Sequence, residues 1–240
     1  MDLGISGRGA AVAAASSGLG RASARALAAE GARVVICGRD RGRVDEAAAD
    51  IGGGCVPIVC DVSDGEGGTR FVLEATEVLG TVDLLVTNGG GPPPGTFAET
   101  ALDAYPAAID MNLMAVVAMC KAAVPSMVER EFGRVVSITS LAVRQPMANL
   151  ILSNTARAGV TGMLKTLARE VAGSGVTVNS VQPGLHRTPR VTQLYGDAPQ
   201  DRMGDPDDFG QIVTFLCSEQ ARFLTGAQIH VDGGAYQALL

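Results

Sequence analysis

The sequence has no tryptophan, and aromatic residues make up only 4% of its 240 residues. Its lysines and arginines form no run interleaved with aromatic side chains, and the formal net charge is −6. Proteins that bind nucleic acid usually carry a basic surface, often with aromatic side chains on which bases stack. We therefore expect no nucleic-acid partner.

Cysteine is sparse too, and no two cysteines have the Cys-x-x-Cys spacing of a zinc site. An odd number of scattered cysteines also argues against a disulfide framework, so we expect reduced thiols, no metal and a cytoplasmic location. We find no signal-peptide pattern and no run of about 18 apolar residues, so we expect no membrane-spanning segment. The cysteines are Cys37, Cys55, Cys60, Cys120 and Cys217.

Short segments rich in valine and isoleucine alternate with longer, alanine-rich segments along the whole chain. Most of the short segments are apolar throughout, which is typical of parallel strands covered on both faces. Seven strands are expected at residues 10–15, 33–37, 55–60, 83–87, 134–139, 176–181 and 227–231. Helices are expected at residues 20–31, 40–52, 68–80, 101–131, 150–173 and 205–220. This alternation predicts one α/β domain over residues 1–240, a Rossmann-type doubly wound sheet.

The turn Ala-Ser-Ser-Gly-Leu-Gly follows the first expected strand, at residues 15–20. Gly18 and Gly20 would let the backbone approach a pyrophosphate, and the helix that follows supplies N–H groups and the positive end of its dipole. Ala14 stands where the first glycine of a G-x-x-x-G-x-G spacing would be. Close packing of strand and helix is the alternative explanation for such a turn. Its place after the first strand favours nucleotide binding.

The end of the second strand bears on the choice between NAD and NADP. A carboxylate at this position would bind both ribose hydroxyls of NAD, but here Gly38 and Arg39 occupy it and Asp40 follows. Arg39 could pair with a 2′-phosphate, which favours NADP over NAD, although a solvated arginine is the alternative. Asp61, after the third strand, is a candidate for the adenine edge. Because Asp64 can cap the next helix, Asp61 is left freer.

Seven segments together resemble the classical short-chain dehydrogenase/reductase family, in the manner of 3-oxoacyl-ACP reductases. They lie in the family's order over essentially the whole chain: VAAASSGLGRA, CDVSD, LLVTNGGG, MNLMAVV, GRVVSITS, VNSVQPGLHRT and TGAQIHVDGG. The resemblance implies the strand order 3-2-1-4-5-6-7 and a nicotinamide cofactor across the carboxyl ends of the strands. It also implies a homo-oligomer that packs through two long central helices.

The same resemblance assigns roles residue by residue. Asn112 matches the helix asparagine whose carbonyl holds a water in a proton relay, and Ser140 matches the serine that orients the substrate. Thr188 matches the threonine of a Pro-Gly-x-x-x-Thr segment at the nicotinamide end. The residues expected to bind cofactor are Ala14, Ser16, Ser17, Gly18, Leu19, Gly20, Arg39, Asp61, Val62, Asn88, Gly89, Gly90, Pro183, Gly184 and Thr188.

The family's acid and its activator are missing from the expected positions. Thirteen residues after the serine the family has its catalytic tyrosine, and four residues later its lysine. Here those positions hold Ser153 and Arg157, and Lys165 lies two helical turns further on. A serine hydroxyl is a poorer acid than a phenol and is shorter. An arginine keeps its charge, so it can anchor a ribose or stabilise an alkoxide, or serve only as a structural cation.

Three explanations follow. Water ordered by Ser140, Ser153 and Arg157 replaces the tyrosine in a working oxidoreductase, or Tyr195 or His186 has become the acid. Alternatively, the chain is a pseudoenzyme that binds a nucleotide or serves in an assembly. We favour the oxidoreductase, because general acid catalysis contributes only about 10²–10⁴-fold to the rate.

The substrate pocket is expected to be walled by residues 90–97, 141–151 and 184–203. Arg144, Arg187 and Arg190 could meet an anionic substrate there or be solvated. The residues singled out for this pocket are Pro92, Pro93, Arg144, Leu185, His186 and Tyr195. The identity of the small-molecule substrate is left open by these residues.

The two long helices at 101–130 and 151–172 carry more alanine, methionine and leucine than one buried face needs. An uncovered apolar stripe of that size is unusual on a monomer. We expect a homodimer or homotetramer through these helices.

Overall fold

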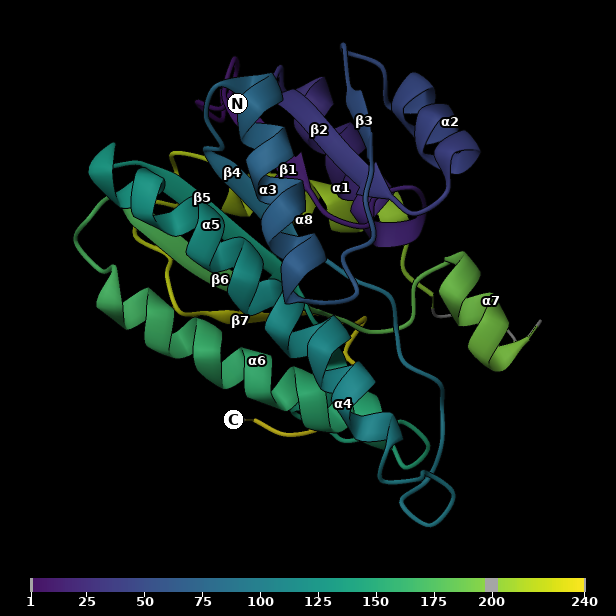
Figure 1. Cartoon of the computed structure of the whole chain (residues 1–240). Helices are drawn as coiled ribbons and strands as arrows, with labels where there is room; N and C mark the ends of the chain where they lie inside the picture. The colour runs from purple at the N-terminus through teal and green to yellow at the C-terminus, as the bar shows by residue number, and fades with distance from the viewer. Residues whose placement is uncertain (1, 197–202, 240) are drawn as a thin grey trace.

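Seven short apolar strands form one parallel sheet in the computed structural model, which describes residues 2–196 and 203–239 (Figure 1). The strands are β1 (Gly9–Val12), β2 (Arg33–Gly38), β3 (Val56–Val59), β4 (Leu84–Thr87), β5 (Gly133–Ile138), β6 (Val176–Pro183) and β7 (Gln228–Val231). Their order is β3-β2-β1-β4-β5-β6-β7, and each neighbouring pair is parallel. The predicted fold class and strand order are confirmed.

Helices cover both faces of the sheet, as its apolar strands require (Figure 1). On one face, α1 (Gly18–Ala29), α2 (Arg41–Ile51) and α8 (Pro206–Leu216) enclose a core that includes Leu27 and Phe209. On the other face, α3 (Gly65–Leu79), α5 (Ala115–Glu129) and α6 (Ile151–Glu170) enclose a core that includes Phe71 and Met119. The sheet therefore carries one hydrophobic layer on each side.

Shorter elements join these layers near the carboxyl edge of the sheet. They are α4 (Ala104–Ile109), a π-helical turn (Asp110–Met114), a 3₁₀ turn (Leu141–Val143) and α7 (Pro189–Tyr195). The sequence analysis did not predict α7, although Pro189 begins it and Thr188 caps it by accepting a hydrogen bond from the Val191 N–H. The single helix expected at 101–131 contains the π-helical turn between α4 and α5.

The helical segment Ala104–Glu129 is the most membrane-like part of the described chain, although Asp110, Asn112 and Lys121 interrupt its apolar residues. An 18-residue window in it has a mean hydropathy of 1.6, which is enough to cross a membrane by length and composition alone. That window is 44% buried inside the protein, and its inward side chains, Met119, Cys120 and Met127, belong to the core. Packing on the sheet thus accounts for one side of this helix.

The carboxyl ends of parallel strands meet at one edge of a sheet, where the polar loops that follow them gather. Here the glycine-containing turn follows β1, Arg39 follows β2, and Asn88 follows β4. Ser140 lies just beyond β5, and Gly184 follows β6. The fold therefore brings together residues that are widely separated in the sequence.

Candidate functional site

A cavity of about 680 Å³ runs along this edge of the sheet. Its lining extends from the turn after β1 and the end of β2 to the start of α6 and to α7. Fourteen of the fifteen residues expected to bind cofactor line it, together with Ser140, Ser153 and Arg157. Its volume lies in the range of ordinary ligand sites.

The turn after β1 is shaped to approach an anion. Gly18 has φ +59°, a conformation that favours glycine, and begins α1. Ser17 precedes the helix, and its side chain makes no capping hydrogen bond. The N–H groups of the first turn of α1 are therefore left for a ligand, and the helix dipole favours a negatively charged one. These features fit a dinucleotide pyrophosphate.

Gly20 corrects one expectation, because it does not line the cavity. A Cβ atom on Gly20 would lie 2.7 Å from Asn88 Nδ2 and 2.9 Å from the Ala14 carbonyl oxygen. The Asn88 amide in turn donates a hydrogen bond to that carbonyl, at 3.2 Å. Gly20 therefore lets α1 pack closely against the loop after β4, which is the packing role first considered as the alternative.

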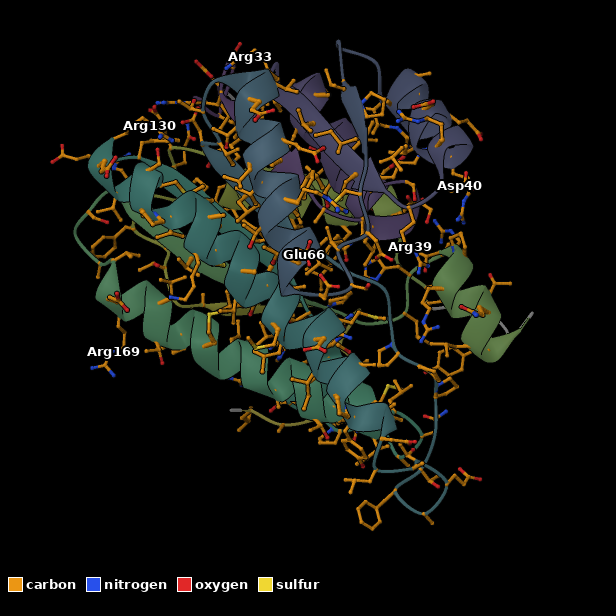
Figure 2. All side chains as sticks on the ribbon, viewed as in Figure 1. Arg33, Arg39, Asp40, Glu66, Arg130 and Arg169 are labelled. Atoms are coloured by element: carbon orange, nitrogen blue, oxygen red, sulfur yellow. The ribbon has the colours of Figure 1, made fainter. Side chains whose placement is uncertain are left out.

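Basic residues lie at the end of the cavity beside β2. Arg39 and Arg43 both line it, and Figure 2 shows Arg39 and Asp40 on the side of the molecule where α7 lies. The Arg39 side chain is 70% exposed, with Nη1 4.0 Å from Asp61 Oδ2. Asp40 caps α2 by accepting a hydrogen bond from the Arg43 N–H, at 2.8 Å.

This capping bond bears on the choice of cofactor. Asp40 caps α2 and does not line the cavity, so its carboxylate is not placed to bind ribose hydroxyls there. Asp61 accepts a hydrogen bond from the Ser63 N–H, and Asp64 caps α3, as expected. Sequence reasoning missed Arg43, although its place three residues after a capping aspartate puts it in the first turn of α2.

Ser140, Ser153 and Arg157 gather at the opposite end of the cavity. Ser140 Oγ accepts a hydrogen bond from the Ala142 N–H, at 3.1 Å, which leaves its own hydroxyl hydrogen free to donate. Ser153 is 8% exposed, and its hydroxyl makes no hydrogen bond with the part of the chain that the structure describes. Ser153 and Arg157 share one face of α6, one turn apart.

The Arg157 guanidinium binds the backbone around it. Nη1 donates to the carbonyl oxygens of Ile138 and Thr139 at 3.2 and 3.1 Å, and Nη2 lies 3.5 Å from the Gly90 carbonyl oxygen. Burial, together with the nearby charge of Arg190, lowers the pKa of Arg157 to about 10. The group is therefore still charged at neutral pH. Lys165 lies elsewhere, with Nζ donating to the Gly226 carbonyl oxygen at 2.8 Å.

Asn112 lies behind Arg157 and not in the main cavity. It is in the π-helical turn, and its Nδ2 donates to the Ala108 carbonyl oxygen at 3.4 Å. Its buried Oδ1 accepts no hydrogen bond from the described residues. Asn112 and Arg157 both line an adjoining hollow of about 10 Å³, roughly the space of one water molecule. This hollow joins the asparagine to the reaction end of the cavity.

The structure divides the residues expected to form the substrate pocket. Leu185, His186 and Tyr195 line the cavity, whereas Pro92, Pro93 and Arg144 do not. The Pro92 carbonyl oxygen instead accepts a hydrogen bond from Arg190, and Arg144 Nε donates to Gln228 Oε1. Val191 and Leu194, from the expected wall segment 184–203, line the cavity as well. Met111, which the sequence analysis did not assign to this pocket, completes the wall, and its contribution depends on tertiary placement.

His186 and Tyr195 were the two candidates for a relocated acid. His186 is 3% exposed, packs edge-on against Phe209 and lies with Nδ1 3.2 Å from the Gly184 carbonyl oxygen. Burial lowers the pKa of His186, so its ring is neutral at neutral pH. The Tyr195 hydroxyl lies 4.0 Å from Met147 Sδ, and Tyr195 also interacts electrostatically with Arg190. Burial of His186 opposes a role as the acid, and the role considered for Tyr195 stays a prediction.

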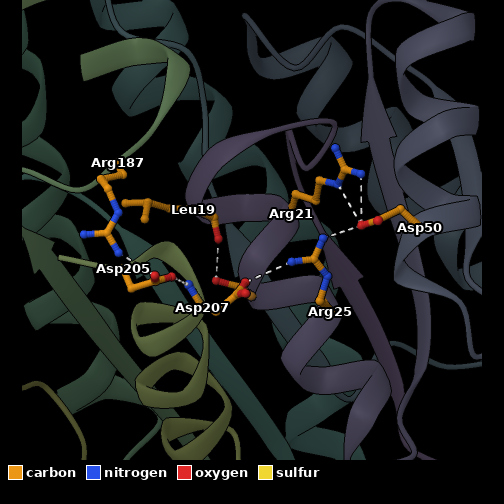
Figure 3. A network of polar contacts seen from close by, with 8 residues as sticks. Leu19, Arg21, Arg25, Asp50, Arg187, Asp205 and Asp207 are labelled. Carbon is orange, nitrogen blue, oxygen red and sulfur yellow. Dashed lines mark hydrogen bonds and ion pairs between the residues drawn. The ribbon is translucent and has the colours of Figure 1, made fainter. Parts of the chain in front are cut away.

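Arg187 is held in a network of ion pairs on the outside of the cavity (Figure 3). It pairs with Asp205, whose carboxylate also accepts a hydrogen bond from the Asp207 N–H. Asp207 pairs with Arg25 of α1, and Arg25 pairs with Asp50 of α2. Arg187 is thus committed to protein partners, unlike the anion-binding role considered for it.

A family model and two known proteins resemble the chain. The family model described as enoyl-(acyl carrier protein) reductase matches residues 13–236. Dehydrogenase/reductase SDR family member 4 from Homo sapiens is 35% identical over 237 residues, which cover 93% of this chain and 85% of that protein. The 3-oxoacyl-[acyl-carrier-protein] reductase FabG from Vibrio harveyi is 31% identical over 242 residues, with coverage of 98% and 99%.

Solved structures agree with these relatives. L-Sorbose reductase from Gluconobacter frateurii, complexed with NADPH and L-sorbose, superposes with a TM-score of 0.92 and 31% identity over all of both chains. A 3-oxoacyl (acyl-carrier-protein) reductase from Agrobacterium tumefaciens C58 with NADP bound gives a TM-score of 0.91 and 30% identity, with coverage of 97% and 96%. The chain belongs to the short-chain dehydrogenase/reductase family of NAD(P)-dependent oxidoreductases.

Proposed function

We propose that the chain is an NADP(H)-dependent reductase that acts on the carbonyl group of a small organic substrate without a tyrosine acid. The observation that carries this proposal is the shared cavity. The anion-binding turn and Arg39 lie at one end of it, and Ser140, Ser153 and Arg157 lie at the other. Reductase neighbours solved with NADPH and with NADP support the same cofactor.

The cofactor preference follows from charge. NADP differs from NAD by a 2′-phosphate, which guanidinium groups bind through paired hydrogen bonds. Arg39 and Arg43 supply two such groups beside the end of β2, whereas Asp40 does not line the cavity. Ser16 and Ser17 add hydroxyl groups beside them. These residues would hold the adenosine end and its extra phosphate.

When bound, NADPH supplies the hydride that reduces the carbonyl carbon. Ser140 is placed to donate its hydroxyl hydrogen to the carbonyl oxygen, because its own acceptor site is used by Ala142. The fixed charge of Arg157 stabilises the negative charge that develops on that oxygen. Ser153 holds a water molecule that gives the proton. Water replaces a positioned phenol here, so we expect slower turnover than with a tyrosine.

One observation favours the alternative, a pseudoenzyme that binds a nucleotide without catalysis. The Arg157 guanidinium is engaged by three backbone carbonyl oxygens, as a structural cation would be. An arginine that only bridges the loops after β4 and β5 would keep the cavity open and do no chemistry. The two proposals differ in whether substrate is turned over.

Steady-state oxidation of NADPH with a panel of small ketones and oxo esters tests the proposal. We expect measurable turnover for the wild type, a modest loss for Ser153→Ala and a larger loss for Arg157→Ala. The double variant Ser153→Tyr with Arg157→Lys should turn over generic ketones faster than the wild type, since it restores the phenol and its activator. If neither the wild type nor the double variant oxidises NADPH with any substrate while both bind NADPH, the protein is a pseudoenzyme.

A further inference from the structure

The reaction end of the cavity carries a second guanidinium group that the proposed hydride transfer does not use. Arg190, in the first turn of α7, donates from Nη2 to the Pro92 carbonyl oxygen at 2.7 Å and from Nη1 to Gln193 Oε1 at 3.1 Å. A Cβ atom on Gly91 would lie 2.7 to 3.0 Å from three atoms of this guanidinium. The group therefore lies directly against the glycine, and a side chain at position 91 would displace it.

Arg157 and Arg190 converge on the same loop. Arg157 contacts the Gly90 carbonyl oxygen from α6, and Arg190 binds the Pro92 carbonyl oxygen from α7. Both side chains line the cavity, and the charge of Arg190 contributes to the lowered pKa of Arg157. Two cations that share a partly buried site repel each other and lose hydration, so an anion placed between them would relieve both costs.

No carboxylate of the described residues neutralises this pair. Asp61 is the one acidic residue among the described residues that line the cavity, and it lies at the opposite end, beside Arg39. The other arginines near the substrate pocket have partners: Arg187 pairs with Asp205, and Arg144 binds Gln228. The excess positive charge at the reaction end is therefore carried by Arg157 and Arg190.

We propose that Arg190, with Arg157 behind it, binds an anionic group of the substrate, so that the enzyme reduces oxo acids in preference to neutral ketones. The proposal rests on the reductase function proposed above. In the balanced reaction, an oxo acid, NADPH and a proton give a hydroxy acid and NADP⁺. The cofactor pyrophosphate is the other anion in reach, because a Cβ atom on Gly18, which begins α1, would lie 3.6 Å from Thr188, two residues before Arg190. The experiment therefore measures the binding of cofactor and of substrate separately.

Matched substrate pairs test this preference. A panel of aliphatic and aromatic 2-oxo and 3-oxo acids is compared with the corresponding methyl esters, which have the same carbonyl group and no charge. For the wild type, we expect kcat/KM to favour at least one acid over its ester by about 10- to 100-fold, the usual effect of a hydrogen bond to a charged group. Arg190→Gln should remove the preference by lowering the value for the acid and not that for the ester.

Arg169→Gln is the matched control. Arg169 is an exposed arginine near the far end of α6, so its loss removes one positive charge without touching the cavity (Figure 2). This variant should keep the preference for the acid. If Arg169→Gln lowers it as much as Arg190→Gln does, the effect is one of net charge and the proposed site is wrong.

Binding measurements separate failure of this inference from failure of the proposed function. NADPH fluorescence gives the Kd for the cofactor, and calorimetric titration of each acid into the protein–NADP⁺ complex reports the second anion. Arg190→Gln should leave the Kd for NADPH unchanged within about twofold and should raise the Kd for the acids. If the variant instead binds NADPH more weakly and the acids equally well, Arg190 belongs to the site of the cofactor phosphates. If no acid in the panel binds or reacts better than its ester, the inference is overturned even though NADPH binds. If NADPH does not bind, the proposed function itself falls.

Discussion

At the scale of single residues, Ala14 holds a conformation that glycine adopts more easily. Its φ is +47°, and its N–H lies 3.3 Å from Sγ of Cys37, which is in β2. A left-handed conformation costs a residue with a Cβ atom about 1–2 kcal/mol, and glycine gives back about 0.5–1 kcal/mol through its flexibility in the unfolded chain. We predict that Ala14→Gly raises the free energy of unfolding by up to about 1 kcal/mol.

Chemical denaturation measures this change, with Ala22→Gly as the control. Ala22 is buried in the middle of α1, so glycine there should destabilise the protein by about 1 kcal/mol. If Ala14→Gly destabilises the protein as much as Ala22→Gly does, the left-handed conformation carries no strain.

Arg39 and Arg43 make a second prediction at this scale. If they bind a 2′-phosphate, the double variant Arg39→Ala with Arg43→Ala should raise the Kd for NADPH by about 10- to 100-fold and leave the Kd for NADH nearly unchanged. Fluorescence titration of both nucleotides measures the two Kd values. Tighter binding of NADH than NADPH by the wild type would contradict the role given to these arginines.

The charge of Arg157 makes a prediction about pH. Stabilisation of a developing oxyanion requires the protonated guanidinium, whose pKa burial lowers to about 10. The group is charged below that pH and loses its proton above it. The rate should therefore be flat near neutral pH and should fall as the pH rises through about 10. Arg157→Ala should lack this alkaline limb.

Profiles of kcat/KM against pH, with stability at each pH checked by circular dichroism, make this comparison. A rate that changes instead at acidic pH, below the normal range of histidine, would indicate that His186 takes part, because burial lowers its pKa. Such a result would restore the relocated acid considered from the sequence.

At the scale of elements, the outer faces of α5 and α6 are candidates for an interface between copies of the chain. Met114 and Val128 are 43% and 36% exposed on the α5 side. On α6, exposed Ala158, Gly159 and Gly162 give a surface of small residues. A Cβ atom on Gly162 would meet nothing within 4 Å, so this surface is open in the monomer. We propose that a dimer or tetramer forms by packing these helices together.

Light scattering measures the predicted assembly. The wild type should be a dimer or tetramer at micromolar concentration, and Gly162→Arg should shift it towards monomer, because a long charged side chain would enter the interface. Arg169→Gln on the same helix is the control and should leave the mass unchanged. A monomeric wild type refutes the prediction.

The elements also indicate how far the sequence alone could go. The apolar segments predicted the ends of every strand to within three residues. They are a clear signal because a strand that is buried on both faces is apolar nearly throughout. The helix α7 was not predicted because seven residues are too few to show a helical hydrophobic period. Its only signal was the cap residue Thr188 followed by Pro189. The π-helical turn was not predicted because its hydrogen bonds leave no pattern in the sequence.

The candidate site shows the same division. Gly18, Asn88 and Ser140 could be placed because each lies at the carboxyl end of a strand, where a parallel sheet gathers its loops. Arg39 and Arg157 could be placed in the same way, and both line the cavity. The positions of Arg187 and Arg144 could not be predicted, because they depend on partners far away in the chain, Asp205 and Gln228.

At the scale of the whole molecule, ion pairs connect the two sides of the cavity. Arg187, next to the Thr188 cap of α7, is linked through Asp205 and α8 to Arg25 of α1, the helix whose first turn faces the cofactor end (Figure 3). These pairs are exposed, so each adds little stability by itself. Their effect is geometric, because they tie the segment before α7 to α8 and α1.

Hydride transfer without a tyrosine is the central claim, and isotope transfer tests it most directly. The protein is incubated with NADPH carrying deuterium at both C4 positions and with the ketone, oxo ester and oxo acid panels. Mass spectrometry then examines the alcohol products. We predict one deuterium at the carbinol carbon of at least one product for the wild type. Arg157→Ala should form much less of this deuterated product in the same time. Products without deuterium for every carbonyl compound, from protein that binds NADPH, would contradict the claim.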